Sequence, residues 1–166
     1  MTVTTLPVAG HVGADSLPWA QWMETTWVRL LRCDESSGTY VMHAKFGAGT
    51  ELPKHRHFGP VQAFTIKGRW RYYEYDWVAT AGDYVFESPG SEHTLLAEED
   101  TEILFTIDGG LIMTGPNGEL WMYEDLHSAR ERYYLALQMK GIDPPIDVLG
   151  GAPAEIPAGL EVAAPA

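Results

Sequence analysis

Cysteine and basic side chains are scarce in this sequence. The 166 residues include one cysteine, Cys33, and 11 Lys and Arg against 23 Asp and Glu. A single cysteine excludes an internal disulfide framework and a cysteine-based zinc cluster, so any metal site must use histidine and carboxylate ligands. The formal net charge of −12 argues against nucleic acid and membrane partners, because both require a cationic footprint. A small or neutral ligand fits this composition better.

Long hydrophobic runs are also absent. No stretch approaches the roughly 18 consecutive apolar residues of a membrane span, and the first residues lack the basic and apolar regions of a signal peptide. We therefore expect a soluble cytoplasmic protein. The length suits one domain, and an aromatic content of 11% favours a packed core over disorder.

Short β-rich runs separated by turn-forming residues dominate the chain. They lie at 27–33, 39–46, 61–66, 69–77, 84–87, 93–96, 101–107, 111–114 and 120–123. The Asn117-Gly118 pair predicts a tight hairpin turn between the last two runs. This spacing is typical of an antiparallel sandwich or barrel.

One segment, 126–140, has the composition of a helix. Asp125 can cap its first turn, and Gly141 followed by two prolines ends it. Its expected apolar side consists of Tyr133, Tyr134, Leu137 and Met139. The sequence thus predicts an N-terminal extension (1–26), a barrel (27–124), a helix (125–141) and an extended tail (142–166), for which a strand exchanged with another subunit is the alternative.

Histidines supply the candidate metal site. His55 and His57 alternate on a predicted strand, so both rings point to one face, and His93 follows in a separate strand. A lone histidine is more often an ordinary surface or core residue than a ligand, but a close pair can share a metal. His11 and His127 are expected at the surface, and no motif supports His43 as a ligand.

These histidines lie in two stretches that resemble the motifs of the cupin family. The residues in register are Gly49, His55, His57 and Gly68 for the first motif, and Gly82, Gly90 and His93 for the second. In the second motif Ser88 takes a proline position and Ala97 replaces an asparagine. The resemblance implies an all-β fold, the cupin (RmlC-like) double-stranded β-helix jelly-roll barrel, here with one C-terminal helix.

One departure from the motifs limits the resemblance to a subgroup of cupins. The position of the family's metal-binding Glu falls on Val61 or Gln62, and neither is a carboxylate. The site therefore resembles the three-histidine variant, with His55, His57 and His93 as ligands, and Glu-dependent reactions such as oxalate decarboxylation are disfavoured.

Two segments resemble the sequences of the acetylacetone-cleaving and 2,4'-dihydroxyacetophenone dioxygenases. They are HRHFGPVQAFTIKGRWRY and GDYVFESPGSEHTL. That resemblance implies Fe(II), with zinc, nickel and manganese as alternatives. It also implies a ketone substrate, dioxygen, cleavage of a carbon–carbon bond next to a carbonyl, and a homodimer.

Other residues are candidates for catalysis or for the pocket wall. Glu87 would orient a ligand histidine or accept a substrate proton, the alternative being a solvated carboxylate at a strand edge. Arg69 and Arg71 share one strand face, where they would steady an enolate oxygen or pair with surface carboxylates. Inward-facing Ala63 and Thr65 and the walls Phe46, Phe58, Phe105 and Met113 complete the predicted pocket.

Two other functions fit the same residues. Zinc also accepts three histidines with an open position, so a non-redox hydrolase, lyase or isomerase is an alternative. A metal or ligand sensor without turnover is another, because the fold alone does not determine function.

Overall fold

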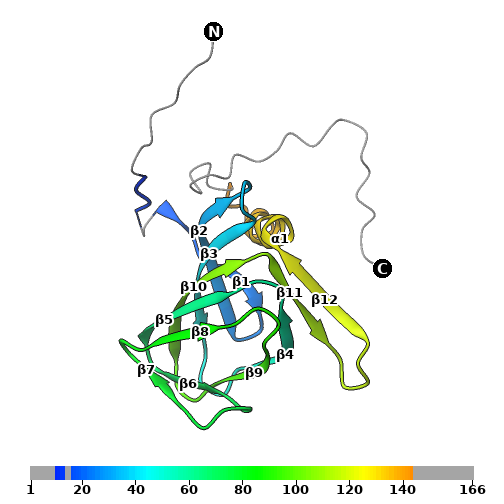
Figure 1. Cartoon of the computed structure of the whole chain (residues 1–166). Helices are drawn as coiled ribbons and strands as arrows, with labels where there is room; N and C mark the ends of the chain where they lie inside the picture. Colours follow the sequence, from blue (N-terminus) through cyan, green and yellow to red (C-terminus); the bar gives the residue numbers. More distant parts are fainter. Residues whose placement is uncertain (1–9, 14–15, 144–166) are drawn as a thin grey trace.

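Two six-stranded antiparallel sheets and one helix form the part of the protein that the structure describes (Figure 1). The computed structural model describes residues 10–13 and 16–143. The first sheet has the order β1-β2-β3-β10-β5-β8 and the second the order β12-β11-β4-β9-β6-β7. The strands are β1 Ala20–Met23, β2 Thr26–Asp34, β3 Thr39–Phe46, β4 Glu51–His57, β5 Val61–Lys67, β6 Arg69–Tyr72, β7 Ala79–Thr80, β8 Tyr84–Glu87, β9 Glu92–Ala97, β10 Thr101–Asp108, β11 Gly110–Thr114 and β12 Leu120–Asp125.

Buried and partly exposed side chains alternate along the strands, and the buried ones form the core between the two sheets. On β10 the buried side chains are those of Thr101, Ile103, Phe105 and Ile107, and the residues between them are partly exposed. Because successive side chains on a strand point to opposite faces, this pattern packs one face of each sheet inward. The expected all-β architecture of two packed antiparallel sheets is therefore confirmed.

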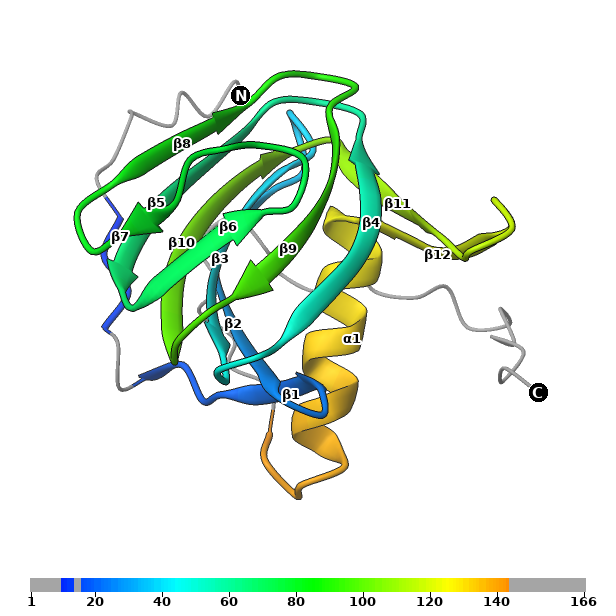
Figure 2. The same cartoon turned by 90° about the horizontal axis from the view of Figure 1, so that it is seen from below.

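The helix α1 Leu126–Gln138 begins as predicted at Asp125, whose side chain accepts a hydrogen bond from the Ser128 backbone. It lies against β1, β2 and β12 (Figure 2). Tyr133 and Leu137 are among its buried residues. The prediction that Met139 lies on the docking side is wrong, since Met139 is 82% exposed. Met139 is the C-cap residue and follows the buried Leu137 by two positions, so the turn of about 200° over two helical residues points its side chain away from the sheet.

The structure corrects two boundaries. The segment expected to precede the barrel contains β1, which pairs with β2. The predicted strand 69–77 stops at Tyr72, where the Tyr75 backbone donates to the Tyr72 carbonyl in a turn, and β7 follows separately. The tail predicted for 142–166 lies outside the described residues from 144 onward.

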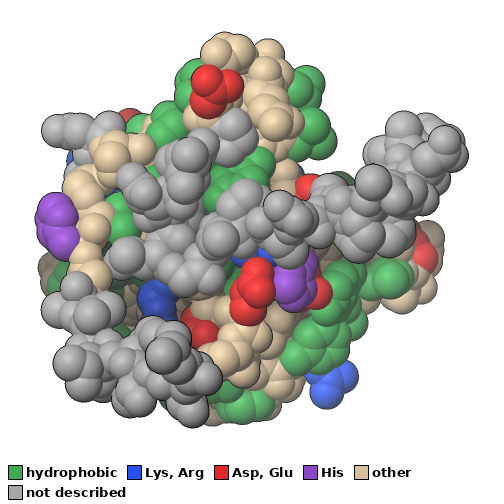
Figure 3. Space-filling model, turned by 90° about the horizontal axis from the view of Figure 1, so that it is seen from above, with side chains coloured by type: hydrophobic (Ala, Val, Ile, Leu, Met, Phe, Trp, Pro, Cys, Tyr) green, Lys and Arg blue, Asp and Glu red, His purple; other side chains and the backbone are tan. Residues whose placement is uncertain are grey.

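The hairpin of β11 and β12 extends away from the barrel (Figure 1). Gly118 at its tip has the positive φ, 79°, expected of a tight turn, but Asn117 does not share it. The Gly118 backbone instead donates to the Gly115 carbonyl in a turn through Pro116 and Asn117. Leu120 and Trp121 on this hairpin are among the exposed apolar side chains, and hydrophobic side chains also reach the surface on the face drawn in Figure 3. Among residues 10–13 and 16–143, no helix is long and apolar enough to span a bilayer.

Candidate metal centre

The three predicted histidines meet on the inner face of the second sheet. His55 and His57 are two positions apart on β4, and His55 pairs directly with His93 of β9. All three side chains are buried, and their potential ligand atoms lie within 4.8 Å of one another. Side chains two positions apart on a strand point to the same face, which brings His55 and His57 together. The pairing of β4 with β9 places His93 beside them.

The ring nitrogens of the cluster are available as metal ligands. Nδ1 of His55 lies 2.8 Å from the Pro53 carbonyl, to which it donates, so Nε2 keeps its lone pair. Burial, with a smaller contribution from His93, lowers the pKa of His55 to about 4. Burial also lowers the pKa of His57 to about 3. Both rings are therefore neutral near pH 7, as metal coordination requires.

Glu87 reaches the cluster from β8 of the opposite sheet. It is 4% exposed, so the alternative of a solvated edge carboxylate does not describe it. One oxygen, Oε1, accepts a hydrogen bond from the Tyr72 hydroxyl. The other, Oε2, lies 3.0 Å from Nε2 of His57 and 3.3 Å from Nε2 of His93. Burial opposes ionisation of Glu87, but contacts with His93, His57 and Tyr72 outweigh it, and the pKa of Glu87 is lowered.

Buried polar atoms of this cluster lack a hydrogen-bond partner within the part of the chain that the structure describes. Neither Glu87 Oε2 nor Nε2 of His93 has a hydrogen bond of suitable geometry there, although the two atoms are close. Unpartnered buried polar atoms are costly, and a bound ion would compensate them. The ligand atoms of the three histidines lie within 4.8 Å of one another, and three imidazoles with an open position are a donor set that divalent metals accept. The residues present therefore fit a metal held by the histidines, with the Glu87 carboxylate beside it.

An interior cavity of about 30 Å³ adjoins the cluster. Its polar lining comes from His55, His57, Tyr72, Glu87 and Glu124, and the rest is apolar. This volume holds about two water molecules, so a larger ligand requires lining side chains to move. A surface depression of about 540 Å³ lies beside the β11–β12 hairpin, but it contains none of the histidines. The chemistry therefore belongs to the smaller, interior cavity.

Comparison with known proteins agrees with this geometry. Residues 9–112, more than half of the chain, match the family described as the ChrR Cupin-like domain. The chain belongs to this cupin family. None of the curated proteins matches the sequence.

Solved structures similar to this cupin include an RmlC-like cupin protein from Ralstonia eutropha JMP134, at 28% identity and a TM-score of 0.77, covering 82% of this chain and 92% of that one. An acetylacetone dioxygenase from Acinetobacter johnsonii has 18% identity and a TM-score of 0.71, covering 82% and 97%. The complex of Rhodobacter sphaeroides SigE with the anti-sigma ChrR has 20% identity and a TM-score of 0.50, covering 58% and 52%. The last two likenesses concern the fold alone.

Tyr72 is the residue of this cupin's metal centre that the sequence did not single out. Its ring stacks on His93 with centroids 3.8 Å apart and planes 14° apart, and its hydroxyl binds Glu87. The available signal was the alternation on β6, which places Trp70 and Tyr72 on one face and the arginines on the other. Alternation separates the two faces but does not indicate which of them is buried.

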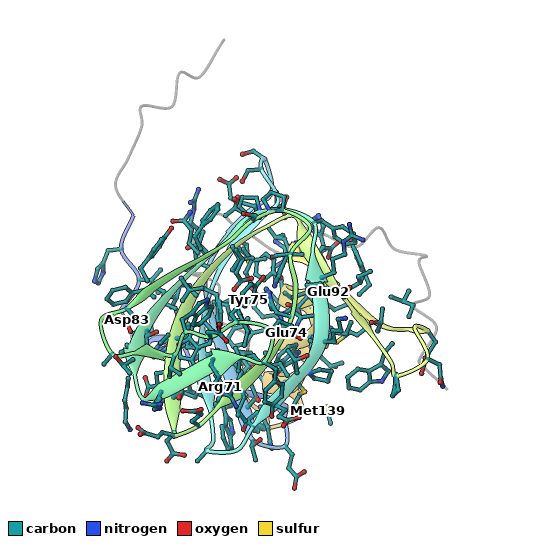
Figure 4. All side chains as sticks on the ribbon, turned by 60° about the horizontal axis from the view of Figure 1, so that its bottom comes forward. Arg71, Glu74, Tyr75, Asp83, Glu92 and Met139 are labelled. Atoms are coloured by element: carbon teal, nitrogen blue, oxygen red, sulfur yellow. The ribbon has the colours of Figure 1, made fainter. Side chains whose placement is uncertain are left out.

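The two arginines predicted as catalytic candidates lie outside the barrel. Arg69 and Arg71 both form ion pairs with Glu98, and Arg71 also lies over the ring of Tyr73. Arg71 is labelled in Figure 4. Placing them in the pocket was wrong, because Trp70 and Tyr72 take the inner face of the strand. The alternative of pairing with surface carboxylates describes both residues.

The pocket walls follow the predictions except at one position. Phe46, Phe105 and Met113 line the cavity, and Ala63 and Thr65 are buried. Phe58 is 53% exposed. It follows His57 directly, so alternation turns its side chain to the opposite face of the sheet from the histidines.

His43 is buried but lies outside the cluster, and it has its own partners. Its Nε2 lies 3.1 Å from a carboxylate oxygen of Glu102, and its ring packs edge-on against Trp19. It therefore belongs to a contact on the first sheet and not to the metal centre.

Proposed function

We propose that this protein is a non-haem Fe(II) dioxygenase that cleaves the carbon–carbon bond next to a carbonyl in an enolisable β-diketone or hydroxyketone. One observation carries the proposal: three buried imidazoles, of His55, His57 and His93, converge with a buried carboxylate beside an apolar cavity. The fold shared with the Acinetobacter johnsonii acetylacetone dioxygenase supports it. Zinc, nickel and manganese are the alternative metals.

The ligand set favours an anionic, chelating substrate. Three neutral imidazoles leave a divalent ion its full charge, whereas a ligand set with a carboxylate would remove one unit. An enolate with two oxygens supplies the missing negative charge. When bound, Fe(II) would act as a Lewis acid towards these oxygens and supply the electrons that dioxygen activation requires.

Glu87 is the proposed proton acceptor in this chemistry. Its Oε2 lies beside Nε2 of His57 and of His93, so a ketone held at the histidines would be within reach of this carboxylate. Its Oε1 stays hydrogen-bonded to the Tyr72 hydroxyl, which fixes the orientation of the carboxylate. The stacking of Tyr72 on His93 holds that ring in turn. The apolar cavity excludes bulk water from the reactive enolate.

Oxygen uptake by iron-loaded protein tests the proposal. We expect consumption with at least one member of a panel of β-diketones and aryl hydroxyketones, with formation of a carboxylate product. His93→Ala should reduce the rate by about 100-fold or more, since loss even of an outer partner of a metal site costs about 10–100-fold. His43→Ala, at a buried histidine outside the centre, is the matched control and should retain the rate. Absence of uptake with every ketone would refute the proposal.

A sensor without turnover is the second candidate. The family match is named for ChrR, and a ChrR–SigE complex shares the fold. In that case, the metal centre would bind a ligand and change the affinity for a protein partner. Ketone binding without oxygen uptake, together with metal-dependent capture of a partner protein, would favour it. Turnover without oxygen by the zinc-loaded protein would instead favour a hydrolase, lyase or isomerase.

A homodimer is part of the proposal. Strand β8 is at one end of its sheet, and its outer face, with the neighbouring face of β5, exposes Phe64, Tyr84 and Phe86. An unpaired edge with exposed aromatic side chains is suited to contact between two copies. Sedimentation velocity should give the mass of a dimer, and Tyr84→Glu should shift it to that of a monomer.

A further inference from the structure

The interior cavity has a second polar wall that the metal chemistry does not use. Glu124 of β12 is 2% exposed and lines the same cavity as His55 and His57. Its Oε1 accepts a hydrogen bond of 3.0 Å from the Tyr40 hydroxyl, and its Oε2 accepts one of 2.6 Å from Arg132 of α1. Burial raises the pKa of Glu124, and Arg132 and Tyr40 oppose that rise.

Strand register defines the distance between Glu124 and the metal centre. Across β4, β11 and β12, His57 pairs with Leu111 and Leu111 pairs with Glu124. All three side chains are buried. Adjacent strands are about 4.8 Å apart, so the Cα atoms of His57 and Glu124 are about 10 Å apart. A molecule held by the metal can therefore reach Glu124 by passing over the apolar side chain of Leu111.

Close packing of β11 on β12 and the contacts of Arg132 hold the Glu124 side chain in a defined position. A Cβ atom on Gly110 would overlap the Glu124 carbonyl oxygen, so glycine is required there for β11 and β12 to approach. The guanidinium of Arg132 lies over the ring of Trp22, with 5.5 Å between its carbon and the ring centroid. Trp22 and Glu124 also line a smaller cavity of about 10 Å³ that includes Arg132 under the helix.

The charges at this second wall indicate which group it binds. Glu124 and Arg132 together carry no net charge, so a charged group on the ligand would lack a counterion there. An ionised carboxylate only accepts hydrogen bonds, and each oxygen of Glu124 retains a lone pair after its hydrogen bond with Tyr40 or Arg132 is made. A neutral hydroxyl meets both conditions, because it has no charge and donates one hydrogen bond.

We propose that Glu124 determines substrate specificity by accepting a hydrogen bond from a hydroxyl at the end of the substrate remote from its chelating oxygens. The substrate class is then a hydroxylated ketone with an apolar spacer that packs on Leu111. This inference rests on the proposed function, because it assumes a ketone chelated at the three histidines. The flexible side chains of Met42 and Met113 line the cavity and provide the movement that such a ligand needs.

Calorimetric binding to zinc-loaded protein tests the inference without turnover. The ligands are 1-phenyl-1,3-butanedione and its 4-hydroxyphenyl and 4-methoxyphenyl analogues, of which only the hydroxyl compound can donate. We expect the hydroxyl compound to bind at least about 10-fold more tightly than either of the others, since a hydrogen bond to a charged group is worth about that factor. In Glu124→Gln this preference should fall to about threefold or less, with the affinity for the phenyl compound unchanged.

Tyr40→Phe is the matched control, because it removes one partner of Glu124 but leaves the carboxylate; it should keep the preference. Equal affinities of the three ligands for the wild-type protein, or no binding of any, would overturn the inference even if Glu124→Gln did not fold. An equal loss of affinity for all three ligands in Glu124→Gln would show a merely structural role and also overturn it. Oxygen uptake is measured separately, so a hydroxyl preference without oxygen consumption would refute the dioxygenase and leave this inference standing.

Discussion

Mild acid should destabilise the metal-free protein through the buried histidines. The pKa of His55 is lowered to about 4 and that of His57 to about 3, whereas both would titrate at 6.5 in the unfolded chain. Between these values the unfolded state binds more protons than the folded state. The free energy of unfolding therefore falls as the pH falls below 6.5.

The size of the effect follows from the same values. At about pH 5 each histidine is 1.5 units below its unfolded pKa and still neutral in the folded protein. At about 1.4 kcal/mol per unit, each contributes a loss of about 2 kcal/mol, and the two together about 4 kcal/mol. Such a loss is a large fraction of the stability of a typical domain. Glu87 adds nothing in this range, because its lowered pKa matters only below its unfolded value of 4.5.

Urea unfolding of the apoprotein at about pH 7.5 and about pH 5, followed by tryptophan fluorescence, measures the loss. His55→Gln cannot take up this proton, so its loss should be smaller than that of the wild type by about 2 kcal/mol. Comparing the two proteins cancels the contributions of other groups, including Glu124. An identical loss in both, or a ring signal of His55 that titrates near pH 6.5 in the folded apoprotein, would refute the reasoning.

Four further substitutions, one of them a control, test other parts of the structure. Gly68→Ala should lower the free energy of unfolding by more than about 2 kcal/mol in a urea titration, because Gly68 has a φ of 83° and an added Cβ would overlap a neighbouring backbone carbonyl. Its control is Gly118→Ala, at a φ of 79° with open space around it, which should lower the same free energy by only about 1 kcal/mol. Asp125→Ala removes the cap of α1 and should cost about 1 kcal/mol, measured by thermal unfolding. Tyr72→Phe keeps the stacked ring but loses the hydroxyl that orients the carboxylate, so kcat should fall about 10–100-fold at unchanged iron content.

The histidine cluster could be predicted because its determinants are local. His55 and His57 are separated by one residue on a strand, and the spacing to His93 follows a pattern that the cupin motifs share. The same holds for α1, whose capping residue Asp125 is adjacent to the helix. Strand β1 could not be identified in this way. It has only four residues, and its stability comes from pairing with β2 and packing on α1.

Residues whose role depends on contacts between sheets could not be assigned from the sequence. The alternation of Arg69 and Arg71 with Trp70 and Tyr72 is visible, but the buried face is decided by burial of the two aromatic rings in the core. Glu124 is a stronger case. Its partner Tyr40 is 84 positions away in the chain, and only the closed barrel brings both to the cavity.

The carboxylate of this centre comes from β8, the strand beside β5. The position of the metal-binding Glu in the cupin motif falls on Val61 or Gln62, and Val61, the buried one of the two, pairs directly with Glu87 of β8. A carboxylate is thus available at the same centre, but it is hydrogen-bonded to Tyr72 and only adjacent to the ligand nitrogens. Transfer of the substrate proton to Glu87 would exchange a neutral ketone and a carboxylate for an enolate and a carboxylic acid. The total charge of the buried site stays constant in that exchange, which avoids the cost of creating a new unpaired charge in the barrel.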